Sequence, residues 1–167
     1  SLETILEALN AALKDAPNLH LVIVGDGSVR DALEDQAKKL GIQEHITFAG
    51  KQKDVRSYLQ AANIFVLPSL TEGISNALLE AMASGLACAA SAVGGNLDVL
   101  GQGKYGFLLP VGDVASWAAA LVELANDAEM RNEMGMLARQ QIFDTYDFSV
   151  VGAAYEATYA ELVAGIA

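Results

Sequence analysis

Cysteine and histidine are scarce in this 167-residue chain, which has one cysteine, Cys88, and two histidines, His20 and His45. A single cysteine excludes a disulfide within the chain and a zinc site built from several thiolates. Two scattered histidines do not form a metal-ligand pattern, so we expect no resident metal. This cysteine usage predicts a reducing compartment, and we expect a cytoplasmic protein.

Cations are also few, with ten Lys and Arg against 21 Asp and Glu and a net charge of −11. This charge repels phosphate backbones and argues against a nucleic acid partner. It leaves room for a small phosphorylated ligand, which needs only local amides and one or two cations. The sequence has no apolar run of membrane-spanning length and no signal-like start.

Short apolar runs alternate with runs of helical period, which predicts an α/β fold: a Rossmann-like parallel sheet with helices on both faces. With 53% hydrophobic and 19% charged residues, the chain suits one domain with a substantial core. We predict strands over residues 19–24, 46–49, 64–67, 87–91 and 106–109, and helices over 2–13, 29–40, 55–61, 72–85, 117–124, 130–137 and 151–162. Because βα units begin with a strand and the first predicted element is a helix, we expect the first strand of the sheet to be missing.

Four loops of this predicted sheet follow the carboxyl ends of strands, where open α/β sheets bind ligands. They cover residues 25–27, 50–54, 69–76 and 92–96. Their glycines let backbone amides approach a ligand, and helix starts offer free N–H groups to an anion. The Gly25-Asp26-Gly27 turn lacks the third glycine of the dinucleotide fingerprint, which argues against NAD.

Two carboxylates eight positions apart, Glu72 and Glu80, mark the third loop and the helix after it. Glu80 lies among Ala, Leu and Met residues, where an ionised carboxylate is costly to desolvate unless it is hydrogen-bonded. For each carboxylate alone we favour a structural role: Glu72 would complement the helix dipole, and Glu80 would bond to a neighbouring amide or hydroxyl. Ser75 and Asn76 have a structural alternative as helix caps. The position of all these residues at one sheet edge favours a ligand instead.

Taken together, these segments resemble the C-terminal, donor-binding domain of retaining glycosyltransferases of family 4, which have the two-domain GT-B architecture. The segments that carry the resemblance are Leu21–Gly27, Phe48–Gly50, Phe65–Ser69, Glu72-Gly73, Leu79–Gly85, Val93–Gly95 and Gly106–Leu108. Ile74–Asn76 and Gly94–Asn96 are similar to a subset that works in bacterial exopolysaccharide assembly. The resemblance runs over almost all of residues 1–167 and implies that the N-terminal acceptor-binding domain is absent from this chain.

The resemblance implies a role for each site residue. Glu72 is the catalytic residue, which contacts hydroxyls of the transferred sugar close to its anomeric centre, and Glu80 binds the ribose diol. A carboxylate accepts two hydroxyl hydrogen bonds from a diol, and such bonds are worth about 1.5–3 kcal/mol each. The amides after Glu72 receive the sugar and the β-phosphate, and the loop after residue 50 lies near the nucleobase. The other implied donor-binding residues are Gly25, Gly27, Gly50, Lys51, Gln52, Gly73, Ile74, Ser75 and Asn76.

The implied reaction transfers a hexosyl group from a nucleoside diphosphate sugar to a glycan or lipid-linked acceptor, with retention and without metal or cofactor. Family members carry an Arg and a Lys after their first strand that grip the diphosphate, and this sequence has neither. We therefore expect the chain alone to be inactive and to bind donor weakly. Two alternatives are a stand-alone nucleotide-binding module that serves a separate catalytic subunit, and a Rossmann-like scaffold without a ligand.

The missing strand carries an expectation of its own. In the family this strand lies inside the sheet, so we expect its absence to expose unpaired edges, which recruit partners, and apolar helix faces. We expect association or strand exchange between copies. The last predicted helix would pack against the absent acceptor domain, and we place the parent enzyme in the cytoplasm, at the inner membrane face if its acceptor is lipid-linked.

Overall fold

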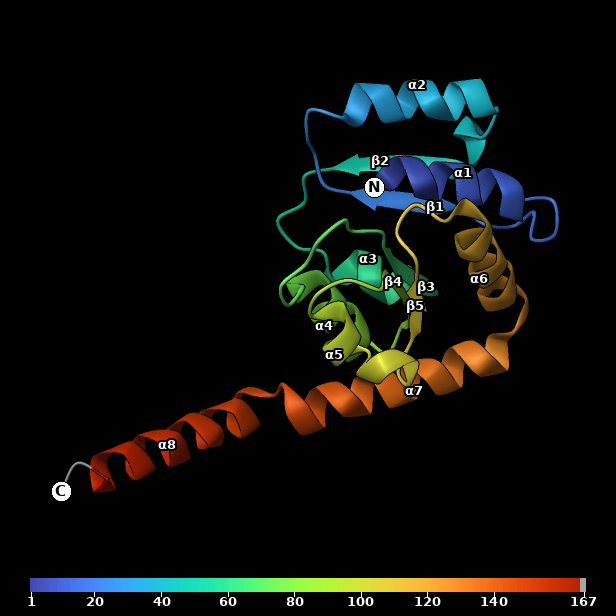
Figure 1. Cartoon of the computed structure of the whole chain (residues 1–167). Coiled ribbons are helices and arrows are strands. Elements are labelled where there is room, and N and C mark those ends of the chain that lie inside the picture. Colours follow the sequence, from blue (N-terminus) through green and yellow to red (C-terminus); the bar gives the residue numbers. More distant parts are fainter. Residues whose placement is uncertain (166–167) are drawn as a thin grey trace.

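Five parallel strands form two separate sheets (Figure 1). In the two-stranded sheet, β1 (Leu21–Val24) pairs with β2 (Ile46–Gly50); in the three-stranded sheet, β4 (Ala87–Ser91) lies between β3 (Ile64–Leu67) and β5 (Phe107–Leu109). The computed structural model describes residues 1–165, and within them no strand joins β1 to β3. All five predicted strands are confirmed.

The helices follow the predicted pattern, with one addition and one shorter helix. α5, of four residues, was not predicted, and the helix predicted over 72–85 begins only at Asn76, so that Glu72 lies in the preceding loop. The helices are α1 (Leu2–Ala12), α2 (Arg30–Leu40), α3 (Arg56–Ala61), α4 (Asn76–Ala83), α5 (Asn96–Val99), α6 (Val114–Asn126), α7 (Ala128–Thr145) and α8 (Phe148–Ala164), with 3-10 turns η1 (Gln43–His45) and η2 (Gly101–Gly103).

The three-stranded sheet has helices on both faces, as predicted. Alternate strand residues point to opposite faces, and in β4 they join two different clusters. Ala87 and Ala89 pack with α1 and α6 around Trp117, whereas Cys88 and Ala90 pack with α4 and α7 around Met82. Every residue of β4 is buried.

The two-stranded sheet is covered on one face only. Leu21 and Ile23 of β1 pack against the cluster formed by α1 and α2. The intervening Val22 and Val24 are 44% and 37% exposed. This sheet therefore has exposed apolar side chains on its open face, while association between copies stays a prediction.

Helix α1 connects the two sheets. Ile5 and Ala12 pack with Trp117 and Leu121 of α6, while Leu6 and Leu9 on its other side pack with α2. Figure 1 shows α1 beside α6, where both cover the same side of the molecule.

The last helix, α8, continues away from the body of the molecule (Figure 1). It has no buried residue, and its Phe148 is 95% exposed. Among residues 1–165, no helix is both long enough and apolar enough to cross a bilayer.

Candidate functional site

The predicted phosphate and sugar loop connects the carboxyl end of β3 to α4. Ser75 is the N-cap of α4, and its buried Oγ accepts a hydrogen bond from the amide of Leu78 at 3.4 Å. The structural alternative for the Ser75 side chain, a helix cap, is thereby confirmed. The helix ends at Ala83 with Ser84 as its C-cap, and Gly85 then adopts a φ of +77°, which glycine allows; the amide of Leu86 bonds to the carbonyl of Ala81.

The amides just before α4 are free to bind an anion. Within residues 1–165, the N–H groups of Gly73, Ile74, Ser75 and Asn76 have no backbone or side-chain acceptor. Unpaired N–H groups at a helix start, together with the positive end of the helix dipole, favour a phosphate or a sugar oxygen. The side chain of Ser75 points into the protein, so this residue offers its backbone only.

Glu72 is held at the same turn. Its side chain is half-buried, and the Ser69 hydroxyl donates to Glu72 Oε1 at 2.7 Å. No further hydrogen bond to this carboxylate is formed in the part of the chain that the structure describes, so Oε2 can accept from a ligand. Ser69 was predicted as the first residue of this ligand-edge loop without a role of its own, and its bond to Glu72 depends on a loop conformation that the sequence does not reveal.

The expectation for Glu80 is wrong in one respect. Glu80 is exposed on α4, because the apolar residues around it, Leu78, Ala81 and Met82, point to the opposite side and are buried. Its carboxylate is therefore not desolvated, and no described group bonds to it. The structural alternative, a partly buried carboxylate bonded to a neighbouring amide or hydroxyl, is not what the described residues form, and the side chain is accessible to a ligand.

A second loop, between β4 and α5, lies directly against the Glu72 turn. The amide of Gly95 points to the carbonyl of Glu72 at 3.4 Å. A Cβ atom on Gly94 would lie 1.9 Å from the carbonyl oxygen of Glu72, and one on Gly95 would lie 2.0 Å from that of Gly73. Two of the four predicted ligand-edge loops are thus in contact through their backbones.

The other two predicted loops meet at the carboxyl ends of β1 and β2. The amide of Gly25 donates to the carbonyl of Gly50 at 2.9 Å, and both glycines have positive φ, +136° and +67°. The amide of Gly27 bonds to the Asp26 carboxylate, which confirms the turn role of Asp26. Gln52 donates from its side chain to the carbonyl of Ala49 at 2.7 Å.

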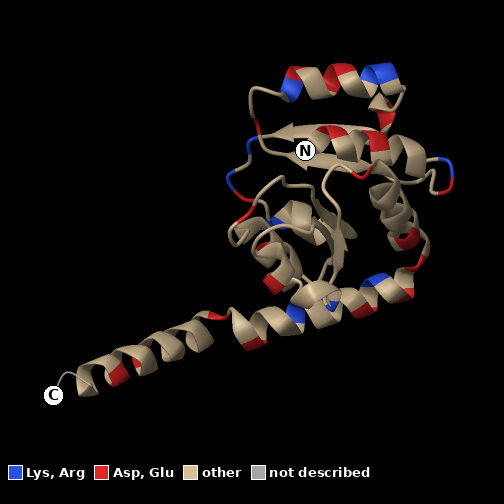
Figure 2. Ribbon diagram, in the orientation of Figure 1, with Lys and Arg blue, Asp and Glu red and all other residues tan. Residues whose placement is uncertain are grey.

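This edge of the two-stranded sheet holds four of the ten cations, some of which Figure 2 shows as blue segments after β2. Two of the four are ion-paired: Arg30 with Glu34 at 2.9 Å and Arg56 with Asp54 at 2.6 Å. Hydrogen bonds from Arg56 lower the pKa of Asp54 to about 2. The other two, Lys51 and Lys53, are exposed and form no ion pair with any residue in the described range 1–165. Their ammonium groups are therefore available to bind an anion such as a diphosphate.

The predicted site residues therefore form two groups. One group, on the two-stranded sheet, contains Gly25, Gly27, Gly50, Lys51 and Gln52; the other, on the three-stranded sheet, contains Glu72, Gly73, Ile74, Ser75, Asn76 and Glu80. No hydrogen bond or ion pair connects the two groups among residues 1–165. In the same range, no cluster of three or more His, Cys, Asp or Glu residues forms a metal site.

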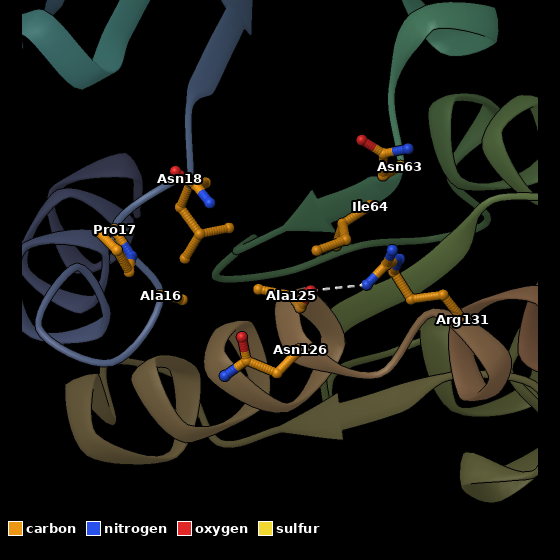
Figure 3. Close-up of a pocket in the computed structure, with 9 residues that line it drawn as sticks. Ala16, Pro17, Asn18, Asn63, Ile64, Ala125, Asn126 and Arg131 are labelled. Atoms are coloured by element: carbon orange, nitrogen blue, oxygen red, sulfur yellow. Dashed lines mark hydrogen bonds between the residues drawn. The ribbon is translucent and has the colours of Figure 1, made fainter.

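A hollow of about 230 Å³ lies at the other end of the strands (Figure 3). Asn18 and Leu19 before β1, Asn63 before β3 and Arg131 of α7 line it. Arg131 is occupied, because its Nη1 donates to the carbonyls of Leu124 and Ala125 at the end of α6. No predicted site residue lines this hollow, and its one cation, Arg131, serves the helix end.

Comparisons with known proteins agree with this geometry. The model of the family described as glycosyl transferases group 1 matches residues 1–141. The N-acetyl-alpha-D-glucosaminyl L-malate synthase of Bacillus anthracis is 32% identical over 143 residues, 86% of this chain and 38% of that protein. The UDP-Gal:alpha-D-GlcNAc-diphosphoundecaprenol alpha-1,3-galactosyltransferase of Escherichia coli is 33% identical over 132 residues, 78% of this chain and 34% of that protein.

A solved structure shows the same arrangement. The C-terminal domain of a glycosyl transferase group 1 family protein from Francisella tularensis matches with a TM-score of 0.79 and 26% identity, over 88% of this chain and 80% of that one. The chain spans less than two fifths of the two curated relatives above. Its fold is that of the C-terminal Rossmann-like domains of GT-B glycosyltransferases. The chain belongs to the group 1 glycosyl transferases.

Proposed function

We propose that this chain is the donor-binding, C-terminal domain of a retaining glycosyltransferase of family 4 that uses a nucleoside diphosphate sugar without a metal ion. The whole enzyme transfers a hexosyl group to a glycan or lipid-linked acceptor in the cytoplasm, with an N-terminal domain holding the acceptor. The name of the Escherichia coli relative gives a UDP-sugar, UDP-Gal, as its donor, which supports this class of substrate. An assignment to exopolysaccharide assembly rests on Ile74–Asn76 and Gly94–Asn96 alone.

One observation supports the proposal most: the turn before α4 combines four unpaired amides with a carboxylate fixed by Ser69. A diphosphate oxygen fits the amides, and sugar hydroxyls fit the free carboxylate oxygen of Glu72. At the reacting centre, Glu72 would also stabilise positive charge that develops on the anomeric carbon. Exposed Glu80 would hold the ribose diol, and Lys51 and the glycine turns would line the base and phosphates.

A titration by ¹⁵N NMR tests this proposal on the 167-residue chain, since the method detects millimolar affinities. We expect UDP or UDP-galactose to shift the amides of residues 73–76. Glu80→Gln should weaken UDP and UDP-galactose equally, by about tenfold, whereas Glu72→Gln should weaken only UDP-galactose. Glu123→Gln, on the exposed side of α6, is the control and should change neither affinity. The proposal fails if UDP, GDP and ADP, with or without sugar, leave these amides unshifted.

The alternative is a nucleotide-binding module without sugar chemistry. It predicts that UDP and UDP-galactose bind with equal affinity and that Glu72→Gln changes neither. For the domain alone we expect no sugar transfer, because the acceptor-binding part of the reaction is supplied by other residues. Transfer by residues 1–167 without a partner would contradict that expectation.

A further inference from the structure

The turn formed by Gly94, Gly95 and Asn96 fits tightly under the Glu72–Gly73 backbone. Neither glycine can carry a Cβ unless the Glu72 or Gly73 carbonyl moves, since the two separations would be 1.9 and 2.0 Å. Gly95 also directs its N–H at the Glu72 carbonyl. The position of the Glu72 backbone is thus set by the turn that follows a different strand, β4.

Asn96 fixes this turn to the end of β4. It is fully buried, and its Nδ2 donates to the carbonyl of Ser91 at 3.0 Å, while its own amide donates to the carbonyl of Val93 at 3.1 Å. The Ser91 carbonyl already accepts from the amide of Val93 at 2.8 Å, so it does not need Asn96 to be satisfied.

The other amide atom of Asn96, Oδ1, is a buried oxygen with no partner among the described residues. A buried oxygen without a hydrogen bond lowers stability. An asparagine at this position is therefore not explained by the stability of the fold, which an apolar side chain would serve as well.

We propose that Gly95 and Asn96 are positioning residues for Glu72: they place its backbone against the edge of the three-stranded sheet so that the carboxylate faces the sugar. Asn96 fixes the turn by its hydrogen bond to the Ser91 carbonyl, and Gly95 packs directly against the Glu72–Gly73 peptide. The Ser69 hydroxyl then orients the carboxylate by its hydrogen bond to Glu72 Oε1. This inference rests on the proposed function, because Gly95 and Asn96 can position Glu72 for a sugar only if Glu72 binds one.

Gly95→Ala is the sharpest test. Gly95 has φ −66° and ψ −10°, a conformation that alanine adopts without strain, so the variant differs only by a methyl group directed at the Gly73 carbonyl. We expect displaced amide signals for Glu72 and Gly73, an unchanged affinity for UDP, and an affinity for UDP-galactose reduced about tenfold. Gly152→Ala, in α8 with nothing within 4 Å of its new Cβ, is the matched control.

Asn96→Ala keeps the test informative if Gly95→Ala fails to fold. It removes one bond to a carbonyl that stays bonded to Val93, so we expect a melting temperature close to that of the unmodified chain. We expect UDP-galactose affinity to fall while UDP affinity stays constant. A residue that only supports the fold would instead lower the melting temperature and both affinities together.

The outcomes separate the inference from the proposed function. If the unmodified chain binds neither UDP nor UDP-galactose, the proposed function fails, and unmoved Glu72 and Gly73 amides in Gly95→Ala would overturn the positioning role by themselves. If the chain binds both ligands and the variants lose them equally, or lose neither, the inference is overturned and the proposed function stands.

Discussion

The strands β1 and β4 have opposite relations between hydrophobicity and burial. β1 consists of the large apolar residues Leu-Val-Ile-Val, yet every second one is exposed. β4 reads Ala-Cys-Ala-Ala-Ser and is buried throughout. β4 has a strand on each side and helices on each face, and the close approach of those helices requires small side chains. Burial in this molecule therefore follows from the number of neighbours a strand has, and not from its hydropathy.

The same difference extends to the ligand edge. On the three-stranded sheet, the loop carrying Glu72 is supported by the β4–α5 turn and by Ser69. On the two-stranded sheet, the Gly25–Gly50 bond is the single hydrogen bond that joins the two loops within residues 1–165, and Lys51 is exposed. We infer that the Glu72 turn is preorganised, whereas the loops after β1 and β2 adapt when a ligand binds.

The largest expected effect concerns thiol protection. Cys88 of β4 is fully buried, so reagents cannot reach its sulfur. Burial also raises the pKa of the thiol, so little of the reactive thiolate forms. We expect it to react with a disulfide reagent at pH 8 at least ~10³-fold more slowly than a Val22→Cys thiol placed on exposed β1 in a Cys88→Ala background. Similar rates for the two thiols would contradict the difference between the sheets.

The next prediction compares truncations in the two sheets. Leu78→Ala removes a fully buried side chain from the cluster between α4 and β4 and should lower the free energy of unfolding by about 2–5 kcal/mol. Val22→Ala, at a residue 44% exposed, should cost less than about 1 kcal/mol. Urea unfolding followed by the fluorescence of Trp117, the only tryptophan, measures both. Equal losses would show that the open face of β1 is covered in solution.

Much of this comparison was predictable from the sequence. Strand and helix periodicity located every strand, and the glycines of the four loops mark the sheet edge at which we expect a ligand. The end of α2 before Gly41 was predictable too, because glycine readily adopts the left-handed conformation that ends many helices; Gly41 has φ +74°. These features depend on local chemistry, which a sequence displays directly.

The features that could not be predicted depend on contacts between distant segments. The apolar neighbours of Glu80 in sequence favoured a partly buried side chain as its structural alternative, but the helix turns Glu80 to the exposed side. The burial of Asn96 and the support of Glu72 by Gly95 join two loops from different strands. The division into two sheets likewise depends on which strands meet, and the sequence pattern alone predicted one sheet.

A smaller effect is expected at the contact between α4 and α7, which exists only beside the three-stranded sheet. A Cβ on Gly135 would lie 2.0 Å from the carbonyl oxygen of Gly85. Gly135→Ala should therefore lower the free energy of unfolding by about 1–3 kcal/mol, although alanine favours helices. Gly152→Ala in α8, with open space around it, should leave stability unchanged or raise it by up to about 1 kcal/mol. Thermal unfolding of both variants decides whether the close approach is needed.

The smallest effect is expected at the exposed pair that follows β2. Hydrogen bonds from the Arg56 side chain and backbone lower the pKa of Asp54 from 3.8 to about 2. Because the pKa is lowered on folding, the stabilisation by this pair is complete above pH 3.8 and is lost as the pH falls toward about 2. Both side chains are exposed, so solvent screens the pair, and its effect on unfolding should be far below that of Leu78→Ala. The ¹³C shift of the Asp54 carboxyl should titrate with a midpoint near 2, and Arg56→Gln should return it toward 3.8. If Arg56→Gln leaves the titration midpoint of Asp54 unchanged, this loop, unlike the Glu72 turn, has no fixed arrangement before a ligand binds.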